Sequence, residues 1–100
     1  MTETSILIVH LNGAEVLQEC LASVFKSTKN AKVHVLFNGT TDSSEEIVKR
    51  KFPKVIRYKS SRILGFAEAS NFLAKKSKAR YIVFLNNDTV VEKNWLDEML

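Results

Sequence analysis

The sequence has little cysteine and no long apolar run, and both absences exclude classes of protein. Cys20 is the only cysteine among the 100 residues, so an internal disulfide and a cysteine-based metal cluster are excluded. The presence of a single cysteine agrees with a reducing compartment. The apolar runs are far too short to span a bilayer, and strand-like residues begin at Ser5, which leaves no room for a signal peptide. We therefore expect a cytoplasmic protein.

Motifs that would identify several common chemistries are also absent. The sequence has no GxGxxG after its first predicted strand, no GxxxxGK[ST] phosphate loop, no HExxH and no GxSxG. The two histidines, His10 and His34, are isolated, and neither has a partner at metal-ligand spacing. His34 lies inside a predicted strand and is expected to be structural. His10 lies at a strand end, where the loops of α/β sheets contact ligands.

The net charge of +4 does not indicate a nucleic-acid partner, because the basic residues have a structural explanation. They gather at the C-terminal ends of predicted helices, where cations complement the helix dipole. These residues are Lys26, Lys29, Lys49, Arg50, Lys51, Lys75, Lys76 and Lys78. No aromatic residues alternate with them to stack bases. Association of the basic side with an anionic membrane, at its inner face, stays open as an alternative.

Apolar periodicity predicts alternating strands and helices in one domain covering residues 1–100. The predicted strands are Ser5–His10, Val33–Phe37, Val55–Tyr58 and Tyr81–Leu85. The predicted helices are Ala14–Ser27, Ser43–Lys51, Gly65–Lys76 and one that begins near Lys93, with Trp95, Leu96, Met99 and Leu100 facing inward. A capping box is expected between Ser43 and Glu46. This order predicts an α/β, Rossmann-like, mostly parallel sheet with helices on both faces.

The most informative stretch is the strand Tyr81–Leu85 and the three residues after it. Its unbroken apolar run is typical of a strand buried on both faces. Asn86, Asn87 and Asp88 follow directly. A carboxylate at the carboxyl end of such a strand can bind a hard divalent cation, which can then hold phosphates. The alternative is that Asp88 caps the next helix.

Three other polar loops are expected at the same edge of the sheet: residues 10–13, 38–42 and 63–67. That edge collects helix N-termini, which favour anions, and acidic side chains, which repel them. A divalent cation between Asp88 and a diphosphate would neutralise both. The sequence therefore predicts a nucleotide site.

In this order the loops resemble the N-terminal half of family 2 glycosyltransferases, which have the GT-A fold. The matching segments are ILIVHLNGAEVLQECLASV, VLFNGTTDSSEEIV, LGFAEASNFLA and YIVFLNNDTVVEKNWLDEML, nearly the whole chain. The resemblance implies a nucleotide-sugar donor (a UDP-, GDP- or dTDP-sugar) bound with Mn²⁺ or Mg²⁺. It also implies transfer to a hydroxyl of a saccharide or lipid-linked acceptor.

The resemblance assigns Asp88, within a DxD-like motif, as the metal ligand. It places the donor nucleotide at His10, Leu11, Asn12, Glu15, Phe37, Asn38, Asp42, Gly65, Asn71 and Asn87. Phe37 departs from the family, which usually has an Asp there that contacts the nucleobase. Leu11 stands where the family often has Tyr, and Asn86 replaces the first Asp of the motif. The identity of the nucleobase is therefore open.

The sequence ends inside an amphipathic pattern with no helix-capping signal, so we expect a truncated domain. The acceptor half and the general base are expected beyond Leu100, and this chain alone is expected to be inactive. The missing half would leave an exposed strand edge, which predicts self-association. One alternative is a non-catalytic module whose nucleotide site has decayed at Phe37 and Ile63. A sugar-phosphate nucleotidyltransferase is disfavoured, because the loop after the first strand is neither glycine-rich nor basic.

Overall fold

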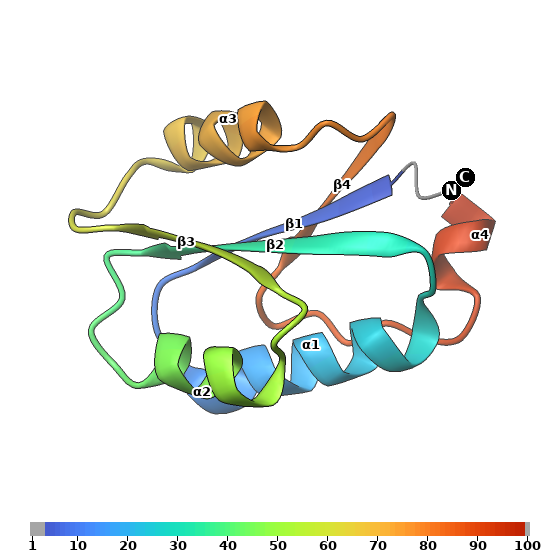
Figure 1. The fold of residues 1–100 in the computed structure, drawn as a ribbon, viewed down its shortest axis with the longest axis horizontal. Coiled ribbons are helices and arrows are strands. Elements are labelled where there is room, and N and C mark those ends of the chain that lie inside the picture. The colour runs from blue at the N-terminus through green and yellow to red at the C-terminus, as the bar shows by residue number, and fades with distance from the viewer. Residues whose placement is uncertain (1–3, 100) are drawn as a thin grey trace.

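A computed structural model describes residues 4–99, whose strands and helices alternate along the chain (Figure 1). The strands are β1 (Thr4–His10), β2 (Ala31–Asn38), β3 (Ile56–Ser60) and β4 (Tyr81–Asn86). The helices are α1 (Ala14–Ser27), α2 (Ser44–Lys51), α3 (Phe66–Lys76) and α4 (Trp95–Met99). Every predicted element is present, and the predicted ends lie within two residues of the observed ones. In the described part of the chain no helix has the length and apolarity needed to cross a membrane.

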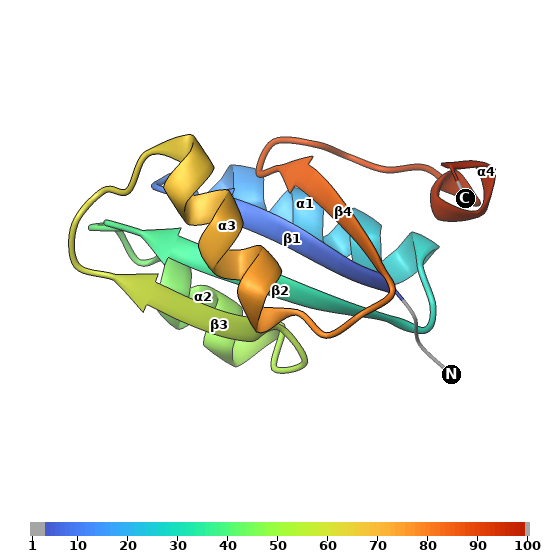
Figure 2. The ribbon, with the colours of Figure 1, turned by 90° about the horizontal axis from the view of Figure 1, so that it is seen from above.

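All four strands are parallel and form one sheet in the order β3-β2-β1-β4. Helices α1 and α2 cover one face of the sheet, and α3 covers the other (Figures 1 and 2). The predicted α/β architecture with helices on both faces is confirmed. Leu96 of α4 is buried and Trp95 is half-buried, as expected for an inward face. The expected inward positions of Met99 and Leu100 lie outside the side chains that the structure describes.

Alternation along the central strands divides the interior into two cores. Because successive strand side chains point to opposite faces, Ile6 and Ile8 of β1 face α1 and α2, whereas Leu7 faces α3. The larger core packs these strand residues against Leu17, Cys20, Leu21, Val24 and Val48. The smaller core joins Leu7 and Leu36 to Ala69 and Leu73 of α3. The two cores hold β1 and β2 rigidly, which positions the loops at their ends.

The prediction that the Tyr81–Leu85 strand is buried on both faces is wrong. Tyr81, Ile82 and Phe84 are 45%, 39% and 46% exposed, and within this strand only Val83 is buried. The reason is that β4 lies at an edge of the sheet, where α3, which packs on β1 and β2, leaves one face of the strand uncovered. An apolar run indicates a strand but does not distinguish a central strand from an edge strand.

The expected capping box of α2 is also wrong. Ser43 occupies the N-cap position but makes no side-chain cap bond. Asp42 takes over this role, because its Oδ1 accepts a hydrogen bond from the Ser44 backbone N–H at 2.9 Å. The first helical residue is thus bound by the side chain two positions before it, which is an Asx turn.

Gly39, directly after β2, occupies a position that only glycine fits without strain. Its φ is +69°, in the left-handed region. A Cβ placed there would lie 2.6 Å from Ile63 Cγ1 and 3.2 Å from the Ile63 backbone nitrogen. The loop before α3 therefore packs against the bare glycine backbone.

We predict that Gly39→Ala lowers the free energy of unfolding by about 1–3 kcal/mol, through backbone strain and displacement of Ile63. Urea unfolding would measure the change. Gly65→Ala is the matched control, because Gly65 has a φ of −63° and a Cβ there would meet nothing within 4 Å. The control should lose less than about 1 kcal/mol. Equal losses in the two variants would contradict this account.

Candidate functional site

The loops that follow β1, β2 and β3 lie together at one end of the sheet (Figure 1). This is the carboxyl edge of the parallel strands, where α/β proteins bind ligands. The turn after β4 belongs to the same edge, because β4 is parallel to β1 and pairs with it. Hydrogen bonds join these loops, through the exposed side chains of Asn12 and Asp42 and the buried side chains of His10 and Asn38.

The first two loops are joined by reciprocal hydrogen bonds between Asn12 and Asp42. The Gly13 backbone N–H donates to Asp42 Oδ2 at 2.8 Å. Asn12 Oδ1 accepts from the backbone N–H groups of Thr41 and Asp42, at 3.0 and 3.2 Å. The two predicted site residues therefore meet, and each side chain binds the backbone of the other loop.

Asp42 is ionised in this arrangement. Burial alone would raise its pKa, but hydrogen bonds from Ser44 and Gly13 outweigh that effect and hold the pKa below its ordinary value. The carboxylate therefore keeps its negative charge at neutral pH. Its acceptor capacity is used by the protein itself, through bonds to Gly13 and to the backbone and hydroxyl of Ser44.

His10 lies at the centre of the edge and has 0% exposure. Its Nδ1 is 2.9 Å from Asn87 Nδ2, and its Nε2 is 2.9 Å from Ser44 Oγ. Because an amide nitrogen can only donate, Nδ1 accepts and Nε2 carries the proton given to Ser44. Ser44 Oγ in turn donates to Asp42. The His10 chain, defined as Asn87, His10, Ser44 and Asp42, thus links the turn after β4 to the loop after β2.

The His10 ring is neutral in this chain. Burial lowers its pKa below the ordinary 6.5, and the nearby charge of Asp42 opposes this only in part. The ring has no exposed surface, and it positions Asn87 by accepting the hydrogen bond from the Asn87 side chain. Direct contact between His10 and a nucleotide stays a prediction.

Asn38 holds the loop between β3 and α3. Its Nδ2 donates to the Leu64 carbonyl at 3.0 Å, and its Oδ1 accepts from the Leu64 N–H at 2.8 Å and from Ser60 Oγ at 3.1 Å. The neighbouring Phe37 points to the opposite face, where it is fully buried in the larger core. Its ring meets the His10 ring edge-on, with centroids 5.8 Å apart.

Asp88 lies in a tight turn and caps no helix. The turn is closed by the Thr89 N–H, which donates to the Asn86 carbonyl at 3.1 Å. Helix α4 begins only at Trp95, so the alternative that Asp88 caps the next helix is wrong. Cys20 of α1 packs against the turn, and its Sγ donates a weak hydrogen bond to the Asn86 backbone oxygen at 3.8 Å. Burial, with a further contribution from the charge of Asp88, raises the pKa of Cys20 to about 11, so the group is a neutral thiol.

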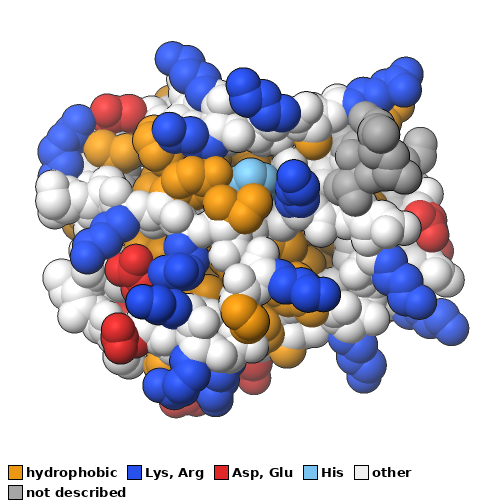
Figure 3. All heavy atoms as spheres, in the orientation of Figure 1, with side chains coloured by type: hydrophobic (Ala, Val, Ile, Leu, Met, Phe, Trp, Pro, Cys, Tyr) orange, Lys and Arg blue, Asp and Glu red, His pale blue; other side chains and the backbone are white. Residues whose placement is uncertain are grey.

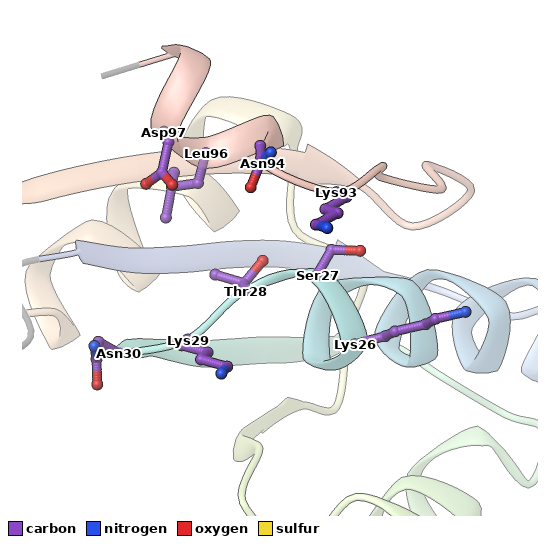
Figure 4. A pocket seen from close by; sticks show the side chains of 9 residues that line it. All are labelled: Lys26, Ser27, Thr28, Lys29, Asn30, Lys93, Asn94, Leu96 and Asp97. Atoms are coloured by element: carbon purple, nitrogen blue, oxygen red, sulfur yellow. The ribbon is translucent and has the colours of Figure 1, made fainter.

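A cleft of about 290 Å³ lies beside this turn. It is lined by Asn86, Asn87 and Asp88, together with apolar side chains that include Phe66 and Phe84. Phe66 is 73% exposed, because it starts α3 at the rim of this cleft. A larger cavity of about 410 Å³ lies elsewhere, between the end of α1 and α4 (Figure 4).

The donor atoms around Asp88 suit a hard divalent cation. Asp88 is exposed and makes no ion pair within residues 4–99. In that same range, no three His, Cys, Asp or Glu side chains are grouped so that they could hold a metal. A cation on Asp88 would therefore take most of its ligands from phosphate oxygens and water, an all-oxygen set that Mg²⁺ accepts.

The other predicted site residues are exposed, and the structure gives their side chains no hydrogen bond to the His10 chain. They are Leu11, Glu15, Gly65 and Asn71. Sequence reasoning missed Ser44 and Ser60. The Asp-x-Ser pattern at residues 42–44 could have indicated Ser44, because Asx turns have this spacing. No local signal indicates Ser60, whose partner Asn38 lies on another strand.

The fold and this edge define the class of the chain: a parallel α/β domain of the GT-A type. Residues 5–100 match the model of the family described as Glycosyl transferase family 2, and the chain belongs to this family. It is 31% identical over 98 residues to an uncharacterized glycosyltransferase of Rickettsia bellii. It is 26% identical over 98 residues to the glycosyltransferase GlyA of Streptococcus pneumoniae. The matches cover 96% and 95% of this chain but only 14% of each relative.

Solved structures confirm the fold. The mannosyltransferase PcManGT from Pyrobaculum calidifontis, in complex with GDP-Man and Mn²⁺, superposes with a TM-score of 0.86 at 17% identity, over 94% of this chain and 30% of that one. S. aureus TarS 1-349 superposes with a TM-score of 0.87 at 19% identity, over 98% of this chain and 31% of that one.

We predict that acid destabilises the protein through its two histidines. Burial lowers the pKa of both His10 and His34 below 6.5, so the unfolded chain binds more protons than the folded one as the pH falls below that value. The free energy of unfolding should therefore decrease between about pH 7 and about pH 5. The stability contributed by Asp42, whose pKa is lowered from 3.8, is lost at still lower pH.

Urea unfolding at a series of pH values would measure this dependence. His10→Gln and His34→Gln should each reduce the slope, and the double variant should abolish the histidine-dependent part. A double variant with the wild-type slope would show that other groups are responsible.

Proposed function

We propose that this chain is the donor-binding part of a glycosyltransferase that holds a nucleotide-sugar at the carboxyl edge of its sheet. The observation that carries the proposal is the carboxylate of Asp88, exposed on a braced turn beside a cleft and without an ion-pair partner in the described chain. Family membership and the similar fold of a mannosyltransferase solved with GDP-Man and Mn²⁺ support it.

In this proposal the turn after β4 binds Mn²⁺ or Mg²⁺ through Asp88. The bound cation would neutralise the diphosphate of the donor and stabilise it as a leaving group. The His10 chain orients Asn87 and so keeps the turn in one conformation. Asn38 and Gly39 hold the loop before α3 close to the same edge. The donor class stays a UDP-, GDP- or dTDP-sugar.

The sugar would pass to a hydroxyl of a saccharide or lipid-linked acceptor. The chain spans 14% of the length of the two curated relatives and about a third of the solved structures it resembles. We assign the acceptor site, and the base that takes the hydroxyl proton, to the part of such proteins that this chain does not span.

A second candidate is a binding module that keeps the fold without turnover. It is favoured by Phe37, which is fully buried and offers no polar group to a nucleobase. Leu11 and Ile63 are apolar and 40% and 63% exposed at the same edge. Each absent hydrogen bond would weaken donor binding by about 1 kcal/mol.

We predict Mn²⁺-dependent binding of at least one of UDP, GDP and dTDP, because the cation must screen the diphosphate from nearby carboxylates. Isothermal titration calorimetry with and without Mn²⁺ would measure it. Asp88→Asn should weaken the metal-dependent binding about tenfold or more.

Glu19→Gln is the matched control, because it also removes one negative charge and Glu19 is exposed on α1. It should bind as the wild type does. Absent or metal-independent binding of all three nucleotides would argue for the second candidate.

We also propose that the chain self-associates through β4. This edge strand, Tyr81–Asn86, has no charged residue and leaves apolar side chains exposed. The other edge strand, β3, contains Arg57 and Lys59, and charges of this kind discourage strand pairing. A second copy of the chain would therefore pair at β4.

Phe84→Lys should shift the protein towards monomer by placing a charge on the β4 edge. Ile56→Lys is the control, because it adds the same charge to the already charged β3 edge. Sedimentation velocity over a range of concentrations would compare them. A wild type that stays monomeric at high concentration would refute pairing through β4.

A further inference from the structure

A second pocket, of about 240 Å³, lies at the opposite end of the sheet from Asp88, on the face that α3 covers. Its floor contains Ser5, His34 and Tyr58, from β1, β2 and β3. Its rim carries Lys32 of β2, and Lys76 and Lys78 from the end of α3 and the segment after it. No acidic side chain lines it.

The floor is an ordered polar chain where a helix-covered sheet is normally apolar. His34 is 4% exposed and Ser5 is 1% exposed. His34 Nδ1 is 3.0 Å from the Tyr58 hydroxyl, and His34 Nε2 is 3.4 Å from Ser5 Oγ. The His34 and Tyr58 rings are stacked, with centroids 5.9 Å apart. Because these groups bond one another, they avoid most of the cost of burial, and they leave a polar floor with which an anion could form a hydrogen bond.

The rim concentrates positive charge. Lys32, Lys76 and Lys78 are exposed, and none pairs with an acidic residue within the described range. The ammonium of Lys76 lies over the Phe72 ring at 5.4 Å, which restrains it near the pocket. The dipole of α3 accounts for a lysine in its last turn but not for Lys32 on the neighbouring strand. On the face drawn in Figure 3, a histidine side chain is visible beside Lys or Arg side chains.

The larger cavity near α4 is also lined by three lysines, Lys26, Lys29 and Lys93, but the carboxylate of Asp97 lines it as well (Figure 4). None of its polar lining side chains is buried.

We propose that the pocket between α3 and the amino ends of β1 and β2 binds a phosphoryl group, such as a phosphate monoester. Three lysines supply charge-assisted hydrogen bonds to the phosphate oxygens. The pocket volume of about 240 Å³ admits a small oxyanion, and the polar floor offers one further donor.

That donor is the Tyr58 hydroxyl. Burial raises the pKa of Tyr58, so the group stays protonated at neutral pH. When His34 carries its proton on Nδ1 and donates it to the Tyr58 oxygen, the Tyr58 O–H is available to the anion. Burial, and then the charge of Lys32, lower the pKa of His34. An anion in the pocket offsets the charge of Lys32 and favours the protonated ring.

The test is a histidine NMR titration with inorganic phosphate, at an ionic strength held constant with sodium chloride. The chain has only two histidines, and His34→Gln assigns their signals. Phosphate should raise the pKa of His34 and leave that of His10 unchanged. No change at His34 would overturn the proposal.

Lysine variants distinguish a specific phosphate site from general electrostatic screening by phosphate. Lys32→Ala and Lys76→Ala should each weaken phosphate binding about tenfold. Lys75→Ala removes the same charge from the same turn of α3 but does not line the pocket, and it should bind phosphate as the wild type does. An equal loss in Lys75→Ala and Lys76→Ala would overturn the proposal.

Sedimentation with vesicles distinguishes two sources of the phosphoryl group, a lipid headgroup and a free phosphate monoester. Sedimentation with vesicles that contain phosphatidic acid, lost in Lys76→Ala and kept in Lys75→Ala, would support a lipid headgroup. A His34 response to phosphate without such sedimentation would support a free phosphate monoester.

Discussion

The hydrogen-bonded His10 chain is the interaction on which the carboxyl edge of this domain depends. A fully buried ring accepts from Asn87 and donates to Ser44, which donates to Asp42. Asp42 then binds the backbone of the first loop through Gly13. One neutral imidazole thus connects loops from three strands. Removing it would leave buried donors and acceptors without partners, and this costs more than the bond itself contributes.

In this arrangement, the residues that hold the loops together are different from the residue that is free to contact a ligand. The geometry of the edge comes from groups whose hydrogen-bonding capacity the protein itself uses, namely His10, Asn38 and Asp42. Asp88 is different, because it is exposed and forms no ion pair in the described chain. A rigid frame that presents one carboxylate is what a cation shared with a diphosphate would require.

Sequence reasoning predicted the elements, the parallel sheet and the family, and each is confirmed. It misjudged β4, because the apolar run at residues 81–85 is the same for a central and an edge strand. It also placed the α2 cap on Ser43, where Asp42 acts instead. The Asx-turn spacing of Asp42 and Ser44 was a local signal that was overlooked, but no local signal indicates the bond of Ser44 to His10, 34 positions away in the sequence.

The sequence by itself determined where strands and helices form and which ends of them carry polar residues, because hydrophobic periodicity and turn residues are local properties. Only the tertiary structure decided which of those polar residues meet. Asn87 reaches His10 across 77 positions, and His34 meets Tyr58 across 24. Such contacts depend on strand order and register: the pairing of β1 with β4 brings Asn87 to His10, and the pairing of β2 with β3 brings Tyr58 to His34.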